Sequence, residues 1–485
     1  MNVRRRVLGA AAGVLLLSGC TSFADTVGAQ HAPAGSATPE HSPHAAGERG
    51  CPAQRAEPDP ERPHVALDFR LADDRTTVTG TETVDFTPDK DVGELVFRLI
   101  PNGPEPAAGG NRLVVDAVHG PDVAGGAYVA AGAAAPGGLY VVTLEHEVAA
   151  GESAEVRLDF TLTLGRGTFE RVGTADGVSW WASGAPLLAW EPGVGWARDP
   201  FVDVSGETAN SPVSDVTLRV SAPAELTVLM TGDQELPVPD GDGRRLWTSA
   251  EPLARDVSIA AGPFTTTEVT APGGVRVTAG VLPDAEVGPE RLAAETSATI
   301  GELQARLGPF PYRTLTVPLL PDYGGGIEYP SSILMASASR GVLVHEVAHM
   351  WFYGMVGNSQ FRDPWLDEAF ATYAEAIVDP RTDADIDIAA ALAIEGDVGD
   401  SMADFADDGT ETYFEVVYGK GGAALLAARE AAGADPFDAA VRCYVDASAW
   451  STATPVDVAA ALADLPAALQ VLVGSGALDT EDLPR

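Results

Sequence analysis

The stretch that decides the fold reads His345-Glu346-Val347-Ala348-His349, and Glu368 follows after eighteen intervening residues. Residues four positions apart on an α-helix lie on the same face, so the two imidazoles can reach one metal ion. Glu346 projects to the side of that ion and can act there as a general base. Two histidines, one further acidic ligand and a base are what a zinc hydrolase requires. We therefore predict one Zn²⁺ per chain, held by His345, His349 and Glu368.

The residues around this pattern favour a metal site over an accidental match. The run from Val342 to Phe352 is apolar and lacks Gly and Pro, as in a buried helix. A histidine in such a helix is more often a packed core residue than a ligand, which is the alternative. The chain contains 8 His, however, and after His146 only His345 and His349 remain. A scarce residue that recurs at ligand spacing indicates a metal site.

Length and charge limit the possible partners. At 485 residues the chain is long enough for two or three domains. Its formal net charge is −40. Binding to nucleic acid requires a cationic face, so we expect no nucleic acid partner. So many acidic residues are typical of a well-solvated surface.

The first residues have the pattern of an export signal. Three arginines, Arg4 to Arg6, precede an apolar run that ends at Leu17 and is shorter than a membrane-spanning helix of about 20 residues. Leu17-Ser18-Gly19-Cys20 resembles the lipobox of bacterial lipoproteins. We predict a signal peptide over residues 1–19, lipidation of Cys20 and a disordered tether over 20–62. The chain would then be anchored to the outer face of the cell membrane; a plain secretory peptide is the alternative.

The 3 cysteines also bear on the compartment. If Cys20 carries lipid, Cys51 and Cys443 remain as a pair in an oxidising compartment, where a disulfide between them is possible. Their spacing does not fit a zinc site made of cysteines. The sequence alone leaves the pairing open.

Residues 63–262 have the two-residue period of β-strands. The alternating runs are separated by Asp-Asp, Pro-Asp and Gly turns, and they lie at 65–71, 77–86, 94–99, 140–144, 154–164, 213–220 and 226–230. Short strands without a helical run predict an N-terminal antiparallel β-sandwich domain. An aromatic-rich segment at 180–192 either packs in its core or forms a wall of the substrate cleft.

Residues 263–485 have a mixed α/β pattern and contain the zinc motif. Strands at 275–282 and 314–320 flank an amphipathic helix at 289–307, which stops at Gly308-Pro309. A second helix over about 363–377 and Ala-rich helices follow the motif. We predict a catalytic zinc metallopeptidase domain over 263–485 with a short helical C-terminus.

Four motifs, in this order, resemble the aminopeptidase N family of zinc metallopeptidases, the gluzincins. They are Gly325-Gly326-Ile327-Glu328-Tyr329, the zinc pattern with its gap to Glu368, Trp365-Leu366-Asp367-Glu368-Ala369-Phe370-Ala371, and Tyr418-Gly419-Lys420-Gly421. The first, third and fourth are similar to the family's Gly-x-Met-Glu-Asn, Trp-Leu-Asn-Glu-Gly-Phe-Ala and Tyr-x-Lys-Gly. The likeness covers about residues 60–430. It implies a thermolysin-like α/β peptidase domain ending in a few α-helices, in a short bacterial lipoprotein member of the family.

The resemblance also implies roles for residues outside the zinc pattern. Tyr418 would donate a hydrogen bond to the oxyanion that forms during peptide hydrolysis. Glu328 would pair with the free α-ammonium group of a peptide substrate, beside a turn at Gly325 and Gly326 that lets backbone approach closely. Glu375, on the same helix face as the acidic ligand, is a candidate partner for a ligand histidine.

These residues together predict zinc-dependent removal of N-terminal amino acids from peptides. Three positions depart from the family pattern: Tyr329 and Asp367 stand where the family has Asn, and Ala369 stands where it has Gly. Pro330 follows Tyr329, so the ammonium site is expected to have a different shape. A thermolysin-like endopeptidase, a non-peptide hydrolase like the leukotriene hydrolase branch, and a non-catalytic surface binding protein that retains the zinc fold are the alternatives.

Overall fold

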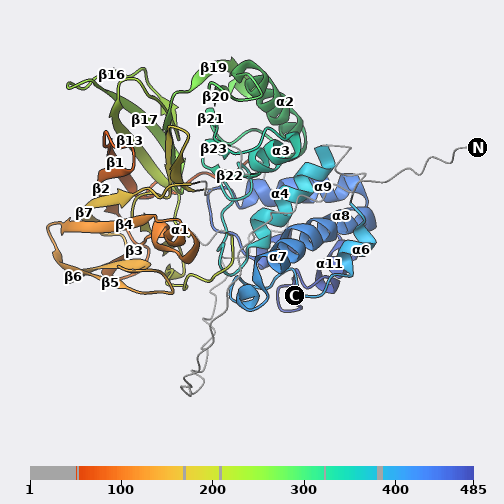
Figure 1. Cartoon of the computed structure of the whole chain (residues 1–485). Helices are drawn as coiled ribbons and strands as arrows, with labels where there is room; N and C mark the ends of the chain where they lie inside the picture. Colours follow the sequence, from red (N-terminus) through yellow and green to blue (C-terminus); the bar gives the residue numbers. More distant parts are fainter. Residues whose placement is uncertain are drawn as a thin grey trace, which may run out of the picture. The chain divides into compact units, whose positions relative to one another are not determined.

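The computed structural model describes residues 51, 54–167, 171–206, 210–321, 324–378 and 386–484, which all belong to one compact unit. The predicted signal peptide, Cys20 and most of the predicted tether lie outside these residues. Figure 1 shows the strands of the N-terminal half gathered on one side and the helices of the C-terminal half on the other. The segments with a strand-like sequence pattern therefore lie apart from those with a helix-like pattern.

The largest sheet has eight strands and contains most of the predicted alternating runs. Its order is β15 (Asp233–Gln234), β17 (Arg244–Ala254), β13 (Ser214–Pro223), β1 (His64–Leu71), β2 (Thr77–Phe86), β7 (Ala154–Thr163) and β4 (Arg112–His119), with β16 (Val238–Pro239) beside β17. Along β7 the side chains are alternately buried and exposed, because successive residues of a strand point to opposite faces.

Three smaller sheets accompany the large sheet before residue 263. One contains β10 (Leu187–Leu188), β3 (Val92–Arg98), β6 (Leu139–Val148) and β5 (Val123–Val129). A second contains β14 (Thr227–Met230), β18 (Ser258–Gly262), β9 (Val178–Ala182) and β8 (Val172–Ala175), and a third pairs β11 (Trp190–Glu191) with β12 (Gly195–Trp196). A short helix, α1 (Pro104–Ala108), follows β3.

The prediction that this region is purely antiparallel is wrong at one strand pair. Strand β1 runs antiparallel to β2 but parallel to β13, with Phe69 opposite Val220. Only a tight hairpin forces neighbouring strands to be antiparallel. About 140 residues separate β1 from β13, so the chain can return in either direction.

The aromatic segment at 180–192 packs in the core of this region. Trp180 and Trp181 are fully buried, and the Trp181 ring lies edge-on to Phe69 with 5.9 Å between centroids. Trp190 is also buried and packs against Trp196 at 4.7 Å. Of the two interpretations of this segment, core packing is the one these contacts support.

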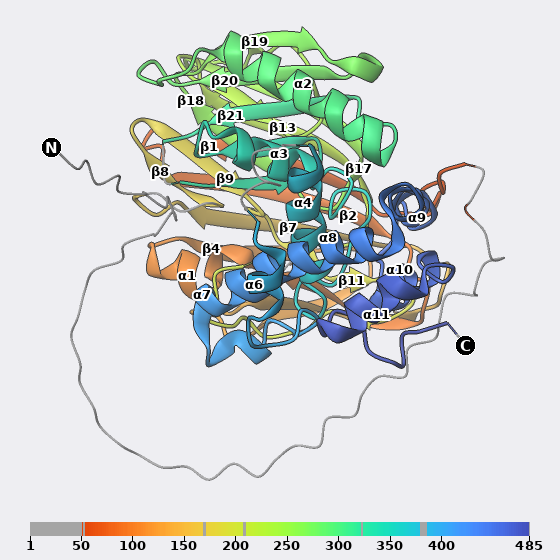
Figure 2. The same cartoon turned by 90° about the vertical axis from the view of Figure 1, so that its right-hand side faces the viewer.

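A five-stranded sheet opens the region that follows residue 263. Its order is β19 (Thr265–Thr270), β20 (Arg276–Val281), β21 (Thr314–Leu319), β23 (Ser332–Met335) and β22 (Gly326–Tyr329). Helix α2 (Pro289–Leu307) connects the parallel strands β20 and β21 and lies alongside β19 and β20 (Figure 2). The predicted helix at 289–307 is confirmed, and Gly308 ends it with a φ of 92°.

Helices dominate the rest of the chain. They are α3 (Arg340–Ala348), α4 (Trp365–Val378), α6 (Ile388–Leu392), α7 (Gly409–Tyr413), the π-helix η4 (Phe414–Lys420), α8 (Gly421–Ala432), α9 (Ala434–Ala447), α10 (Pro455–Ala461) and α11 (Pro466–Gly474). One hydrophobic core joins α2, α3, α4, α8 and α9 to the five-stranded sheet. Among the described residues, no helix has both the length and the apolar character needed to cross a membrane.

A disulfide joins Cys51, at the start of the described chain, to Cys443 on α9. The two Cα atoms lie 5.0 Å apart, although 392 positions separate them in sequence. Neighbouring contacts support the attachment: Arg55 forms an ion pair with Asp446 at 3.0 Å and donates a hydrogen bond to the carbonyl of Pro309 at 2.9 Å. The bond thus fixes the N-terminal segment to the helical region.

Replacing Cys443 with Ser is expected to lower the free energy of unfolding by about 2–5 kcal/mol, because the disulfide closes a very long loop and so restricts the unfolded chain. Chemical denaturation of the oxidised wild type and of the variant measures the difference. Reductant should destabilise the wild type to the level of Cys443→Ser and leave the variant unchanged. Equal stability of the oxidised wild type and the variant would contradict the prediction.

Candidate active site

Helix α3 carries the zinc pattern and ends within it. The helix spans Arg340–Ala348, so His349 is the residue that caps it, with its N–H still bonded to the carbonyl of His345 at 3.3 Å. The apolar run was expected to stay helical to Phe352. Instead the chain turns: Tyr353 has a φ of 83°, and the N–H of Gly354 bonds back to the carbonyl of His349 at 2.9 Å.

Gly354 explains this turn. A Cβ at this position would lie 3.0 Å from the carbonyl oxygen of Met350 and 3.1 Å from that of His349. Glycine lets the chain fold back this closely on the end of α3 without crowding these carbonyls. The turn then leads to α4, which supplies the third ligand.

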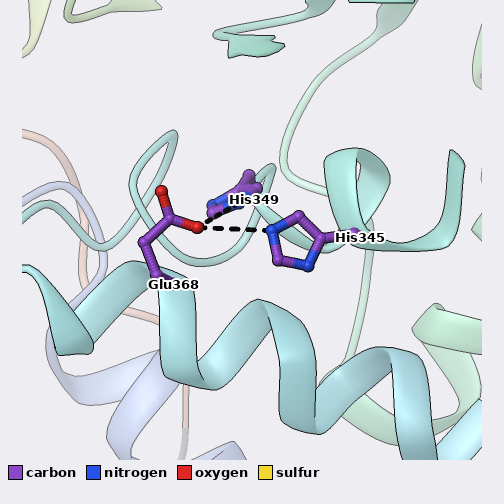
Figure 3. A group of neighbouring side chains, drawn as sticks. All are labelled: His345, His349 and Glu368. Atoms are coloured by element: carbon purple, nitrogen blue, oxygen red, sulfur yellow. Dashed lines mark hydrogen bonds and ion pairs between the residues drawn. The ribbon is translucent and has the colours of Figure 1, made fainter. Parts of the chain in front are cut away.

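Three side chains converge at the junction of α3 and α4. The Nε2 of His345 lies 3.3 Å from Oε2 of Glu368, and the Nε2 of His349 lies 3.4 Å from the same oxygen (Figure 3). The two imidazole rings stand nearly perpendicular, with centroids 4.8 Å apart. The structure therefore brings together the three ligands predicted from the sequence.

This cluster fits a tetrahedral zinc ion. Its donor atoms, two imidazole nitrogens and one carboxylate oxygen, are those of catalytic zinc sites and lie within 4.8 Å of one another. Ligand atoms bound to one Zn²⁺ at about 2.0–2.2 Å lie about 3.3–3.5 Å apart in a tetrahedron. The two nitrogen–oxygen distances, 3.3 and 3.4 Å, match that spacing.

The members of this cluster shift one another's pKa. Burial of His349 favours its neutral form, but the carboxylate of Glu368 outweighs burial and raises the pKa of His349 to about 9. Burial alone would raise the pKa of Glu368, yet the two histidines lower it well below its ordinary value. Metal binding requires the neutral imidazole of His349, so it competes with protonation of this residue.

Each ligand histidine has a carboxylate within 4.0 Å of its second ring nitrogen, Nδ1. Glu375, which follows Glu368 on α4, places its Oε2 3.9 Å from Nδ1 of His345. Glu328, on β22, places Oε1 3.8 Å from Nδ1 of His349. Both separations are too long for a hydrogen bond, so each carboxylate acts on its imidazole through charge. Glu375 lies beside a ligand histidine, for which the sequence made it a candidate partner.

Glu346 is buried between α3 and the edge strand β22. A Cβ on Gly326 would lie 2.7 Å from Cγ and 2.8 Å from Oε1 of Glu346, so the side chain occupies the space that any larger residue at 326 would need. Carboxylate oxygens of Glu346 and Glu328 lie within 4.8 Å of each other and of a nitrogen of His349. The predicted general base thus lies beside the metal ligands.

Tyr418 lies beside His345. Its ring is parallel to the His345 imidazole, at 10° and with 5.8 Å between centroids, and Phe414 packs on its outer face at 4.7 Å. Tyr418 belongs to the π-helix η4, a rare geometry that occurs frequently at functional sites. Tyr418, which the sequence alone would not have singled out, therefore lies beside the cluster.

Two features hold η4 and the start of α8 in place. The ammonium group of Lys420 donates hydrogen bonds to the carbonyls of Ile394 at 2.9 Å and Gly396 at 2.5 Å. Gly421 and Gly422 allow close helix contact, since a Cβ on Gly421 would lie 2.7 Å from the Cβ of Ala369. Lys420 belongs to the Tyr418-Gly419-Lys420-Gly421 motif, in which it had no predicted role. Its buried position shows that it anchors the tyrosine segment.

Other predicted positions are less central. Gly325 lies just before β22, and its carbonyl accepts a hydrogen bond from the N–H of Ala336 at 2.8 Å. Tyr329, which stands where the family has Asn, directs its hydroxyl to Ser183 at 3.3 Å and to Arg171 at 3.4 Å. Tyr329 therefore connects β22 to the N-terminal region. The predicted lipidation position, Cys20, lies outside the described residues.

Comparison with known proteins gives a family match for the catalytic region. Residues 328–474 match the peptidase family M1 domain, a range that contains all three predicted ligands, the predicted base and Tyr418. This region is an M1 peptidase domain. A zinc metallopeptidase domain of this kind implies one Zn²⁺ per chain, and the cluster of His345, His349 and Glu368 is the candidate site.

Curated relatives cover only parts of this chain. Aminopeptidase M1-A of Oryza sativa subsp. japonica is 24% identical over 183 residues, which is 32% of this chain and 21% of that protein. Aminopeptidase N of Streptomyces lividans is 56% identical over 34 residues, or 7% of this chain and 4% of that protein. The chain thus spans about a fifth or less of these two relatives.

Solved structures share the fold over nearly the whole chain. An M1 zinc metallopeptidase variant from Deinococcus radiodurans aligns with a TM-score of 0.65 and 20% identity, covering 91% of this chain and 99% of that one. A two-domain M1 zinc metallopeptidase bound to L-tryptophan aligns with a TM-score of 0.63, also at 20% identity. The chain therefore has the fold of a two-domain M1 metallopeptidase, with a sheet-rich N-terminal region and a helical C-terminal region.

Proposed function

We propose that this chain is a zinc aminopeptidase that removes amino acids from the N-terminus of peptides. The observation that carries the proposal is the position of Glu328. Its side chain is only 4% exposed and clusters with Glu346 and His349, yet it is neither one of the three ligands nor the base. A buried carboxylate beside the reacting centre is what the α-ammonium group of a peptide requires as a partner.

The remaining residues perform the steps of hydrolysis. Glu346 accepts a proton from the attacking water and returns it to the leaving amine. Tyr418 donates a hydrogen bond to the oxyanion that develops on the carbonyl oxygen. When bound, Zn²⁺ supplies Lewis acidity toward that oxygen and lowers the pKa of a nearby water. Glu328 holds the substrate's amino terminus, which sets which bond is cleaved.

The names of similar proteins support this proposal. The curated relatives from Oryza sativa and Streptomyces lividans are both aminopeptidases. One structure with the same fold, from Deinococcus radiodurans, contains a Tyr-Ser-Ala substrate. Peptides with a free amino terminus are therefore the substrate class to test first.

Glu328→Ala is expected to lower kcat/KM for aminoacyl amides by at least about 10²-fold, because the ammonium group loses its charged partner. With both proteins fully loaded with zinc, cleavage of N-acetylated peptides, if the wild type shows any, should be unaffected. The measurement is a panel of free and N-blocked fluorogenic substrates, with and without a chelator. Equal loss on both classes would favour an endopeptidase. A zinc-loaded wild type that hydrolyses neither class would favour the non-catalytic binding protein.

We also propose that the chain is exported and attached to the outer face of the cell membrane through lipidated Cys20. The arginines before the apolar run and the Leu17-Ser18-Gly19-Cys20 sequence support this. Cys20→Ala is expected to move the protein from the membrane fraction to the soluble fraction. A Cys20→Ala chain that stays in the membrane fraction would contradict the proposal.

We infer in addition that the N-terminal region is a β-sandwich and that the following domain has a thermolysin-like plan. In support, Phe69 and Phe160 of the eight-stranded sheet and Phe97 of the sheet containing β3 belong to one hydrophobic cluster. An experimental structure in which these two sheets have separate cores would contradict the sandwich.

A further inference from the structure

The carboxylates beside the two ligand histidines come from different secondary-structure elements. Both direct Nε2 toward Glu368, so each has its Nδ1 available for a second partner. For His345 this partner is Glu375, which comes from α4 together with Glu368. For His349 it is Glu328, which comes from the edge strand β22. The residue placed to bind substrate thus also contacts a metal ligand.

Burial makes the contact between Glu328 and His349 effective. Their side chains are 4% and 1% exposed, whereas those of Glu375 and His345 are 19% and 14% exposed. A charge acts more strongly on its neighbour where water is excluded. At nearly equal distances of 3.8 and 3.9 Å, Glu328 is therefore expected to act on its histidine at least as strongly as Glu375 does.

The strand that carries Glu328 is held in place on both sides. Glu328 is paired with Ile333 of β23 in the five-stranded sheet. The next residue, Tyr329, is fully buried, and its hydroxyl lies 3.3 Å from the hydroxyl of Ser183 in the N-terminal region. A side chain on a fixed strand can orient another group, because its own position is defined.

We propose that Glu328 has two partners: it positions the metal ligand His349 through Nδ1, and it receives the ammonium group of the substrate. The second role rests on the proposed function, and the first does not. An ionised carboxylate has two oxygens and about four acceptor sites, so one carboxylate can hold both donors. Glu328 is thus a positioning residue for the metal centre as well as a substrate-binding residue.

The test compares zinc affinities of isosteric variants. Glu328→Gln and Glu375→Gln each remove one charged partner of a ligand histidine, while Glu302→Gln, whose carboxylate pairs with Arg340 at the start of α3, is the control. Zinc dissociation constants are measured on metal-free protein by competition with a chromophoric chelator. We expect Glu328→Gln and Glu375→Gln each to weaken zinc binding by about 10–100-fold, and Glu302→Gln to have no effect.

Substrate assays on the fully zinc-loaded proteins separate the two roles. Glu328→Gln should discriminate against free amino termini, whereas Glu375→Gln should affect free and blocked substrates equally. A Glu328→Gln protein that binds zinc as tightly as the wild type, while Glu375→Gln binds it more weakly, would overturn the proposal. A wild type that hydrolyses no aminoacyl amide would instead refute the proposed function and leave the zinc comparison valid.

A second variant covers the case in which Glu328→Gln fails to fold. Glu328→Asp keeps the charge but withdraws it by one methylene, and we expect a zinc affinity between those of the wild type and Glu375→Gln. The visible absorption of the Co²⁺-substituted protein, which reports the arrangement of the ligands, should shift in Glu328→Asp and not in Glu302→Gln. An unchanged spectrum together with unchanged zinc affinity in Glu328→Asp would overturn the proposal.

Discussion

Glu346→Gln is expected to lower kcat/KM for peptide substrates by about 10²–10⁴-fold, because a positioned general base contributes a factor of this size. The substitution keeps the shape of a side chain that packs tightly against Gly326, so the fold should be unchanged. It removes none of the three metal ligands. Steady-state kinetics on the wild type and the variant, with zinc content measured on the same samples, checks the prediction.

The matched control for this experiment is Glu302→Gln on α2, which alters an exposed ion pair with Arg340. It should retain full activity, since exposed ion pairs contribute little. If Glu346→Gln keeps more than about a tenth of the wild-type activity with a full complement of zinc, then another group accepts the proton and the assignment is wrong.

The metal ligands could be predicted because their spacing is local. His345 and His349 lie one helical turn apart, so a sequence pattern contains their geometry. Glu368 follows on the next helix. Its role could be predicted because a zinc site with two histidines requires a third ligand, and an acidic residue can supply it. The alternating runs and the helix at 289–307 were predictable for the same reason, since each depends on a local period.

What the sequence did not predict depends on contacts between distant residues. The parallel pairing of β1 with β13 joins segments about 140 residues apart, and no local pattern contains the direction of such a pair. The early end of α3 depends on the turn at Gly354. The apolar run before this glycine suggested instead that the helix continues to Phe352. The packing of Gly326 against Glu346 brings an edge strand onto a helix. Sequence patterns describe elements, and these features arise between elements.

The position of Tyr418 could be recognised only from the family motif. The π-helix that carries it has no simple sequence period, and its place beside His345 depends on Lys420 and on the glycines that start α8. The structure places its ring parallel to that of a predicted metal ligand. The role of the hydroxyl group can therefore be tested by removing it alone.

Tyr418→Phe is expected to lower kcat by about 10²–10³-fold and to leave KM nearly unchanged, because it removes the proposed hydrogen-bond donor to the oxyanion of the transition state. The ring remains, so its stacking on His345 and the zinc affinity should be preserved. Initial-rate kinetics over a range of substrate concentrations separates kcat from KM, and chelator competition measures the zinc affinity.

Tyr444→Phe is the matched control for Tyr418→Phe. Tyr444 is buried on α9, where its ring stacks on Phe370 at 5.4 Å and its hydroxyl has no hydrogen-bond partner among the described residues. Removing that hydroxyl deletes the same atom without touching the site, so kcat should be unchanged. If Tyr418→Phe is as active as Tyr444→Phe, the oxyanion has another donor. If KM rises while kcat holds, the hydroxyl binds substrate and transition state equally well and contributes to affinity alone.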